Sequence, residues 1–303
     1  MNEFIEIEKT DWIDAPDFMP DRHEFIIGDV HGRILQLNSI IHEMSKFETE
    51  HARLTFLGDL INRGPDSIGC MITAVSDGDG KFAGKRNILL GNHEIMMIRS
   101  ALPIPYGLEA FEVWRLGAGG EQMIDEFATP KTTHKTLKND IALAIAKRVG
   151  YEGDLDVGLE ILNQVWNAPI YIESGNMLMV HAGIPPYLEK YKLSKWMDRD
   201  RSIHELPFNE DLPVKIRYPF LDYVGPFHTG HFVVHGHTPE HGIGPKGWDE
   251  TPHISHHVLK GCRLSLDGHY DDDGAVVGAE ILPGKYRIYR APNSAKVEKK
   301  VAA

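Results

Sequence analysis

Polar side chains that can bind metal ions recur along the chain, each time directly after a short apolar run. They are Asp29, His31, Asp59, Asn92, His93, His181, His235 and His237. Carboxylate, carboxamide and imidazole groups hold divalent ions in proteins. Any one of these residues has an ordinary explanation, since an Asp can cap a helix and a His can be a hydrogen-bonded core side chain. Their repetition at equivalent positions instead predicts a shared metal site.

The spacing of these residues predicts two ions that share one anionic bridge. Two cations about 3.5 to 4 Å apart need a bridging group and further ligands of their own, and Asp59 is the natural bridge. Asp29 and His31, one residue apart, can both face the first ion. The second ion would be held from separate segments by Asn92, His181 and His237. Oxygen and imidazole donors without thiolate suit Mn, Fe or Zn better than Ca, so we expect two divalent ions, with manganese first and iron or zinc as alternatives.

Strand, loop and helix units must position the first of these residues. The apolar runs are residues 24–28, 53–58 and 86–91, and helical spacing follows each of them. Parallel strands need crossover connections, so the units predict a largely parallel sheet packed against helices. Ligand sites in such sheets lie beyond the carboxyl ends of the strands. Asp29, Asp59 and Asn92 all fall at such ends.

The rest of the chain predicts an inserted helical layer and then more strands. The insert covers about residues 103–167, with helical patterns at 107–127, 134–149 and 155–166. A hairpin is expected over 168–174 and 176–183, a strand over 231–237, and an antiparallel meander near the end. No linker divides the chain. We therefore expect a single domain over 1–303, with a core of about 24–290 and a disordered tail from about 293 to 303.

Net charge, hydropathy and cysteine content exclude several classes of partner, location and site. The net charge of −12 argues against a nucleic-acid partner, because phosphate backbones are held by clustered Lys and Arg. No apolar run is long enough for a membrane span and the first residues lack a signal pattern, so we expect no membrane association and a cytoplasmic location. Two cysteines, Cys70 and Cys262, cannot form a disulfide framework or a thiolate zinc site. The oligomeric state stays open.

Five motifs carry a resemblance to a known family. They are GDVHG at 28–32, GDLINRG at 58–64, GNHE at 91–94, VHAG at 180–183 and VHGHTP at 234–239. Over about residues 24–290 the chain resembles the calcineurin-like metallophosphoesterases of the phosphoprotein phosphatase branch. Within that branch it is similar to bacterial serine/threonine phosphatases and to symmetrical diadenosine tetraphosphate hydrolases. The resemblance implies an α/β fold, a four-layer β-sandwich of mixed sheets flanked by helices.

The resemblance also implies a mechanism and roles for individual residues. It implies the same six metal ligands, and attack on phosphorus in line by a hydroxide that bridges the two ions. His93 would protonate the leaving group and Arg63 would bind the phosphate. Arg217 would complete this clamp, or is an ordinary surface arginine. His235 stays open between a ligand and a residue that supports the ligands.

One position departs from the family pattern. Where these phosphatases commonly have GDxxDRG, this chain has Asn62 in place of the second Asp, which orients the catalytic His and supports its charge. An amide carries no negative charge, so His93 should be harder to protonate. We expect a reduced turnover, or a preference for substrates whose leaving group needs little protonation.

These observations leave more than one substrate class. The first expectation is hydrolysis of phosphate monoesters, as a serine/threonine protein phosphatase whose substrate is a phosphorylated protein or a small phosphoester. The alternative is a diadenosine polyphosphate hydrolase, in which Tyr106, Phe111 and Trp114 could form a shelf for the nucleobase, with buried helix packing as their other explanation. A catalytically weak metal-dependent binding protein is a third possibility, suggested by Asn62.

Overall fold

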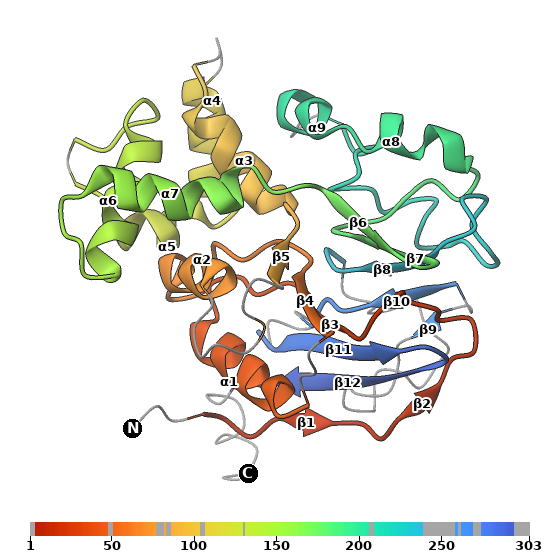
Figure 1. The fold of residues 1–303 in the computed structure, drawn as a ribbon. Coiled ribbons are helices and arrows are strands. Elements are labelled where there is room, and N and C mark those ends of the chain that lie inside the picture. The colour runs from red at the N-terminus through yellow and green to blue at the C-terminus, as the bar shows by residue number, and fades with distance from the viewer. Residues whose placement is uncertain are drawn as a thin grey trace, which may run out of the picture.

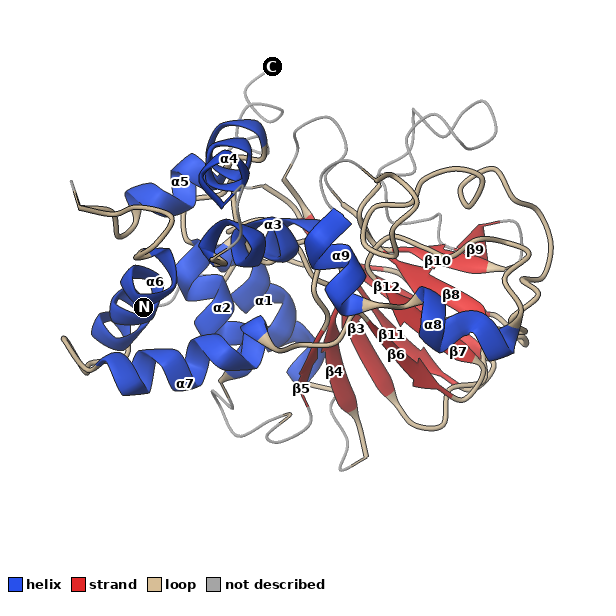
Figure 2. Cartoon of the chain, turned by 90° about the horizontal axis from the view of Figure 1, so that it is seen from above, coloured by secondary structure: helices blue, strands red, loops and turns tan. Residues whose placement is uncertain are grey.

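Two mixed β-sheets lie face to face in the computed structural model, and helices flank them (Figures 1 and 2). The structure describes residues 4–47, 51–76, 82, 86–103, 107–129, 131–205, 209–238, 258–259, 262–268 and 274–293. This architecture confirms the expected α/β class with mixed sheets flanked by helices. Tyr106 and almost all of the expected tail lie outside the described residues.

The first sheet contains the three predicted parallel strands. Its order is β1 (Glu8–Lys9), β12 (Lys285–Ala291), β11 (Val276–Leu282), β3 (Glu24–Ile27), β4 (Arg53–Phe56) and β5 (Arg86–Ile88), with β2 (Ile13–Asp14) also paired to β12. Strands β3, β4 and β5 are parallel, whereas β11 joins β3 in the antiparallel sense. The sheet is therefore mixed, because a hairpin from the end of the chain completes it.

The second sheet carries the other two segments with candidate ligands. Its order is β6 (Tyr171–Ser174), β7 (Met177–Val180), β8 (Phe232–His235), β10 (Arg263–Ser265) and β9 (Val258–Leu259). The predicted β6–β7 hairpin is present, and β7, β8 and β10 are parallel. The expected C-terminal meander is divided into two antiparallel pairs, β9–β10 and β11–β12, which lie in different sheets. Strand β10 pairs with β8 in this sheet, whereas β11 and β12 cross to the first sheet.

An apolar layer holds the two sheets together. Side chains alternate between the faces of a strand, so each strand sends one set of residues inward. The inward-facing residues with no exposed surface include Ile26, Leu57, Leu89, Met179, Val234, Leu264 and Ala279. Because this layer aligns the sheets, the carboxyl ends of β3, β4, β5, β7 and β8 reach one common edge.

Helices cover the outer sides of the sandwich. Helix α1 (Ile34–Ser45) packs against β11 and β12, α2 (Ser67–Val75) packs against β5, and α3 (Asn92–Ala101) follows β5. The chain forms three further helical segments after β7 and before β8: η2 (Lys190–Lys192), α8 (Leu193–Trp196) and α9 (Arg199–Glu205). Figures 1 and 2 both place α8 over the second sheet. None of the helices in the described part of the chain has the length and hydropathy of a membrane span.

The insert adds helices on the same side of the strands as α1, α2 and α3, and it packs against α2 and α3 (Figure 2). Its elements are α4 (Gly107–Glu112), the π-helical turn η1 (Val113–Gly117), α5 (Gly120–Asp125), α6 (Leu137–Arg148) and α7 (Leu155–Trp166). The helical pattern predicted over 107–127 is present as the three segments α4, η1 and α5. It breaks at Gly119, whose φ of +71° belongs to the left-handed region that glycine adopts without strain.

The packing of α6 on α7 generates a stability prediction. A Cβ added at Gly158 would lie 1.9 Å from the carbonyl oxygen of Ala142, so Gly158→Ala must push the two helices apart. We expect a loss of about 1 to 3 kcal/mol in the free energy of unfolding, measured by urea denaturation. At Gly117 a Cβ meets nothing within 4 Å, so Gly117→Ala is the matched control and should cost nothing. Equal denaturation midpoints for both variants would contradict the close helix crossing.

Candidate metal centre

Tight turns after the strands aim the candidate ligands at one point. The residues at these turns have positive φ, with values of 46° at His31, 51° at Asp59 and 67° at His237. Residues other than glycine enter this region at a cost of about 1 to 3 kcal/mol each, and such strain clusters at functional sites. The strain therefore coincides with the predicted ligands.

Glycines in the motifs make room for the carboxylates. A Cβ at Gly91 would lie 2.1 Å from Oδ1 of Asp59, and one at Gly236 would lie 2.1 Å from Oδ1 of Asp29. The space beside each glycine is therefore filled by a carboxylate from another strand end. The backbone N–H of His237 also donates to Oδ1 of Asp29, at 3.0 Å. These contacts explain why glycine precedes Asn92 and His237 in the sequence.

Asp59 lies at the middle of the cluster. Its Oδ2 is 3.6 Å from Nε2 of His31, and its Oδ1 is 3.4 Å from Nε2 of His181. Among the described residues, two groups have ligand atoms close enough to share an ion: His31, Asp59 and His93, and Asp59, His181 and His237. Asp59 belongs to both groups, as a bridging carboxylate must. Asp29 lies further out, with its Oδ2 3.9 Å from Nε2 of His31.

Asn92 joins the second group from the end of β5. Its Oδ1 lies 3.0 Å from Nε2 of His181 and 2.8 Å from Nδ1 of His237. Ligands bonded to one metal at about 2.1 Å are themselves about 3.0 to 3.5 Å apart. The spacing of these atoms matches that requirement.

Backbone carbonyls orient two of the imidazoles. Nδ1 of His31 donates to the oxygen of Ile61 at 3.1 Å, and Nδ1 of His181 donates to the oxygen of Leu57 at 3.0 Å. With Nδ1 bonded to a carbonyl, Nε2 is the ring nitrogen that faces the cluster. Both rings are therefore preset as metal ligands.

The electrostatics of the cluster favour a cation. Burial alone lowers the pKa of His181, but the charge of Asp59 and its hydrogen bond outweigh burial and raise this pKa to about 9. Burial would raise the pKa of Asp59, yet the charges of His181 and His93 hold it well below its usual range. Nε2 of His237 is buried and has no hydrogen-bond partner within the described parts of the chain. Donor types, spacing and charge thus fit a pair of divalent ions.

Arg63 and His93 lie beside the cluster on the side of the first group. The guanidinium of Arg63 donates to Nε2 of His31 at 3.0 Å and to Nε2 of His93 at 3.3 Å. Guanidinium groups only donate, so the ring proton of neutral His93 is on Nδ1. Nδ2 of Asn62 lies 2.8 Å from this Nδ1, and Oδ1 of Asn62 is buried without a partner among the described residues. Because an acceptor is needed beside the Nδ1 proton, a half-turn of the amide, which exchanges its oxygen and nitrogen, would satisfy both groups. Burial lowers the pKa of His93 to about 4; the charge of Asp59 opposes burial, and the charges of Arg63 and His181 add to the lowering.

Arg217 and His235, whose roles the sequence does not decide, have different surroundings in the structure. Arg217 is partly exposed and lies 3.9 Å from Glu210, and its positive charge helps burial and His181 to lower the pKa of His237. His235 is buried against the ring of Phe220, at 4.9 Å between centroids. It belongs to neither ligand group found among the described residues. Arg217 thus lies near the cluster, whereas His235 packs behind it.

Glu94 positions the loops of the cluster, a task that its place in the GNHE motif did not by itself reveal. Its fully buried carboxylate accepts from the backbone N–H groups of Asp59 at 2.7 Å, Leu60 at 2.8 Å and Gly91 at 2.9 Å. It therefore ties the loop after β4 to the start of α3. A signal was available, because Glu three residues after a helix cap commonly turns back to the backbone.

The insert contacts the site at Gly119. The backbone N–H of Arg63 donates to the carbonyl oxygen of Gly119 at 3.2 Å. Trp114 and Phe111 lie in the apolar core, with 0% and 8% of their surface exposed. Helix packing therefore accounts for both aromatic residues, and neither forms an accessible shelf.

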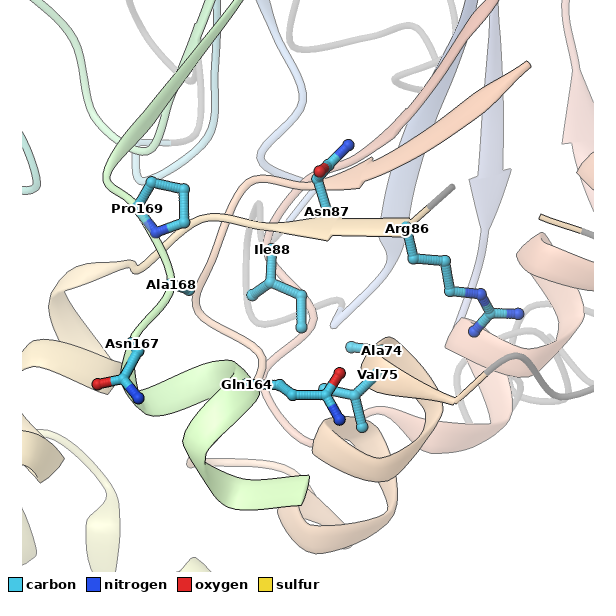
Figure 3. A pocket seen from close by; sticks show the side chains of 9 residues that line it. All are labelled: Ala74, Val75, Arg86, Asn87, Ile88, Gln164, Asn167, Ala168 and Pro169. Atoms are coloured by element: carbon cyan, nitrogen blue, oxygen red, sulfur yellow. The ribbon is translucent and has the colours of Figure 1, made fainter. Parts of the chain in front are cut away.

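A cavity of about 500 Å³ lies away from this cluster (Figure 3). It is lined by Ala74, Val75, Arg86, Asn87, Ile88, Gln164, Asn167, Ala168 and Pro169. All three residues of β5 line it, and none of the six candidate metal ligands does. The cavity is therefore separate from the candidate metal centre.

Two known proteins are similar to this chain in sequence. A symmetrical bis(5'-nucleosyl)-tetraphosphatase from Coxiella burnetii is 28% identical over 56% of this chain and 45% of its own length. Serine/threonine-protein phosphatase 1 of Salmonella typhimurium is 42% identical over 16% of this chain and 23% of its own. The matched part of this chain thus spans less than half of either relative.

A solved structure and a family model extend the comparison. The crystal structure of a putative diadenosine tetraphosphatase is 18% identical, with a TM-score of 0.48, over 90% of this chain and 96% of its own. The model of the calcineurin-like phosphoesterases matches residues 25–263, a stretch that contains all the candidate ligands. The chain therefore belongs to the calcineurin-like phosphoesterase family.

Proposed function

We propose that the chain hydrolyses phosphoric esters or anhydrides at a centre of two divalent ions. The ions would be held by Asp29, His31, Asp59, Asn92, His181 and His237. The position of Asp59 carries this proposal, since its two oxygens face imidazoles from different sheets and it belongs to both ligand groups. The chemistry of the donors supports manganese, with iron or zinc as alternatives.

The residues around the centre have distinct tasks in this proposal. Bound divalent ions would supply an acidified water molecule and neutralise charge on the phosphoryl oxygens. Arg63, already directed at the cluster, would bind the phosphoryl group with its planar pair of donors. His93 would give the proton to the leaving oxygen, and Asn62 would hold its ring in place. Arg217 would bind the substrate from the more exposed side.

We propose a dinucleoside polyphosphate as the substrate. The match to the Coxiella tetraphosphatase supports it, because that match covers 56% of this chain. Phosphoserine or phosphothreonine in proteins, the first expectation from the sequence, is the second candidate. The match to the Salmonella phosphatase favours it over a short region, and the burial of Phe111 and Trp114 removes the nucleobase shelf expected from the sequence.

A parallel assay separates these candidates. Manganese-loaded protein is incubated with diadenosine tetraphosphate, a phosphoserine peptide and an aryl phosphate, and kcat/KM is measured for each. We expect the highest value for the dinucleotide, with symmetrical cleavage into two equal nucleotides. A higher value for the peptide would replace the first candidate with the second. Hydrolysis of none, with bound metal verified by elemental analysis, would support a binding protein.

Substitution of the bridge tests the metal centre. Asp59→Asn removes one negative charge that both ions would share, so metal content and activity should fall together. The loss of activity should exceed about 100-fold, the upper range for residues that only support ligands. Asp200→Asn, which alters a carboxylate that is 84% exposed on α9, should change neither. Full activity in Asp59→Asn would refute the two-ion arrangement.

The departure at Asn62 generates a prediction about leaving groups. Asn62→Asp places a negative charge beside Nδ1 of His93 and favours the protonated ring. The rate for a phosphoserine peptide, whose alkoxide needs a proton, should rise by about 10-fold or more relative to an aryl phosphate. Asn139→Asp adds the same charge on the exposed side of α6 and should leave the ratio unchanged. An unchanged ratio in Asn62→Asp would show that this amide does not limit proton transfer.

A further inference from the structure

Asp267 follows the end of β10 and lies beside a candidate ligand from β8. The two strands are parallel, with Ser265 paired to His235. The pairing continues one step further, because the N–H of Leu266 donates to the oxygen of His235 at 2.8 Å. The next residues along the two strands are Asp267 and His237, so both reach the same edge of the sheet.

A second contact places Asp267 beside the first metal position. A Cβ at Gly28 would lie only 1.9 Å from the carbonyl oxygen of Leu266. The end of β3 therefore touches the end of β10 across the two sheets. Asp29 follows Gly28 and Asp267 follows Leu266. Each Asp is therefore one residue beyond the point at which the two strand ends meet.

The two carboxylates also interact through their charge. Asp29 and Asp267 are both acidic, and the strand ends that carry them are in contact at Gly28 and Leu266. Asp29 is 1% exposed, so little water screens this repulsion. Two like charges at a buried site destabilise a protein unless a proton or a cation lies between them. A divalent ion on the Asp29 side would remove that repulsion.

We propose that Asp267 is a further acidic residue of the metal centre, which raises its affinity for the divalent ion on the Asp29 side. This inference rests on the proposed function, because it assumes that Asp29 faces the first ion. It adds a third carboxylate to those of Asp29 and Asp59. The strand end of β10 thereby contributes to the centre in the same way as those of β3 and β4.

The variant Asp267→Asn tests this role without any measurement of activity. Removal of the repelling charge should raise the thermal midpoint of the metal-free protein. The same change should weaken Mn²⁺ binding at one of two sites by about 10- to 100-fold in calorimetry, and should reduce the rise in midpoint on Mn²⁺ addition. A residue that only supports the fold would lower the metal-free midpoint instead.

Further variants keep the test decisive. Asp267→Glu retains the charge, so it should keep most of the affinity even if Asp267→Asn folds poorly, while Asp200→Asn on α9 controls for loss of one exposed carboxylate. Unchanged Mn²⁺ affinity in Asp267→Asn would overturn the inference and leave the proposed function intact. Absence of Mn²⁺ binding by the wild-type chain would overturn the metal centre itself, together with the role of Asp267.

Discussion

The buried carboxylate of Asp59 is the interaction on which the arrangement of this protein depends. Removing a charge from water costs several kcal/mol unless other charges and hydrogen bonds compensate. Here the compensation comes from imidazoles that follow strands of both sheets. The charges of these imidazoles hold the pKa of Asp59 well below its usual range. The strands, the apolar layer between the sheets and the tight turns all serve to bring these groups within reach of one carboxylate.

The turns that deliver these groups are strained, and the surrounding structure offsets that strain. Asn62 and Arg63 are consecutive residues with φ of 74° and 64°, in addition to Asp59 itself. The loop that contains them is held by two backbone hydrogen bonds to Glu94, from the N–H groups of Asp59 and Leu60. The pKa of Glu94 is raised to about 7, first by burial and then by the charge of Asp59. A conformation that is costly for each residue is thus maintained by contacts from a neighbouring strand end. Such preset geometry needs little rearrangement when a substrate binds.

Much of this arrangement follows from the sequence, because strand periodicity and motif spacing are local signals. The parallel strands β3, β4 and β5, the hairpin β6–β7 and the positions of Asp59 and His181 were all predictable from such signals. The crossing of β11 to the first sheet was not, since its neighbour is chosen by long-range packing. The break of the insert helix at Gly119 and the position of Asp267 also depend on distant contacts. His235 shows the same limit, because only its contact with Phe220 places it behind the cluster.

The candidate ligands come from both sheets, and this has a consequence for the folding of the chain. Asp29 and His237 are 208 residues apart in sequence, yet they lie at the same edge. Any ion bound there would act as a cross-link that closes a very long loop, and such links stabilise a protein partly by restricting its unfolded chain. Each sheet alone would supply only part of the coordination shell. The edge that performs the chemistry would then also link the two sheets of the sandwich. The rate at which the protein unfolds would therefore depend on the supply of metal ions.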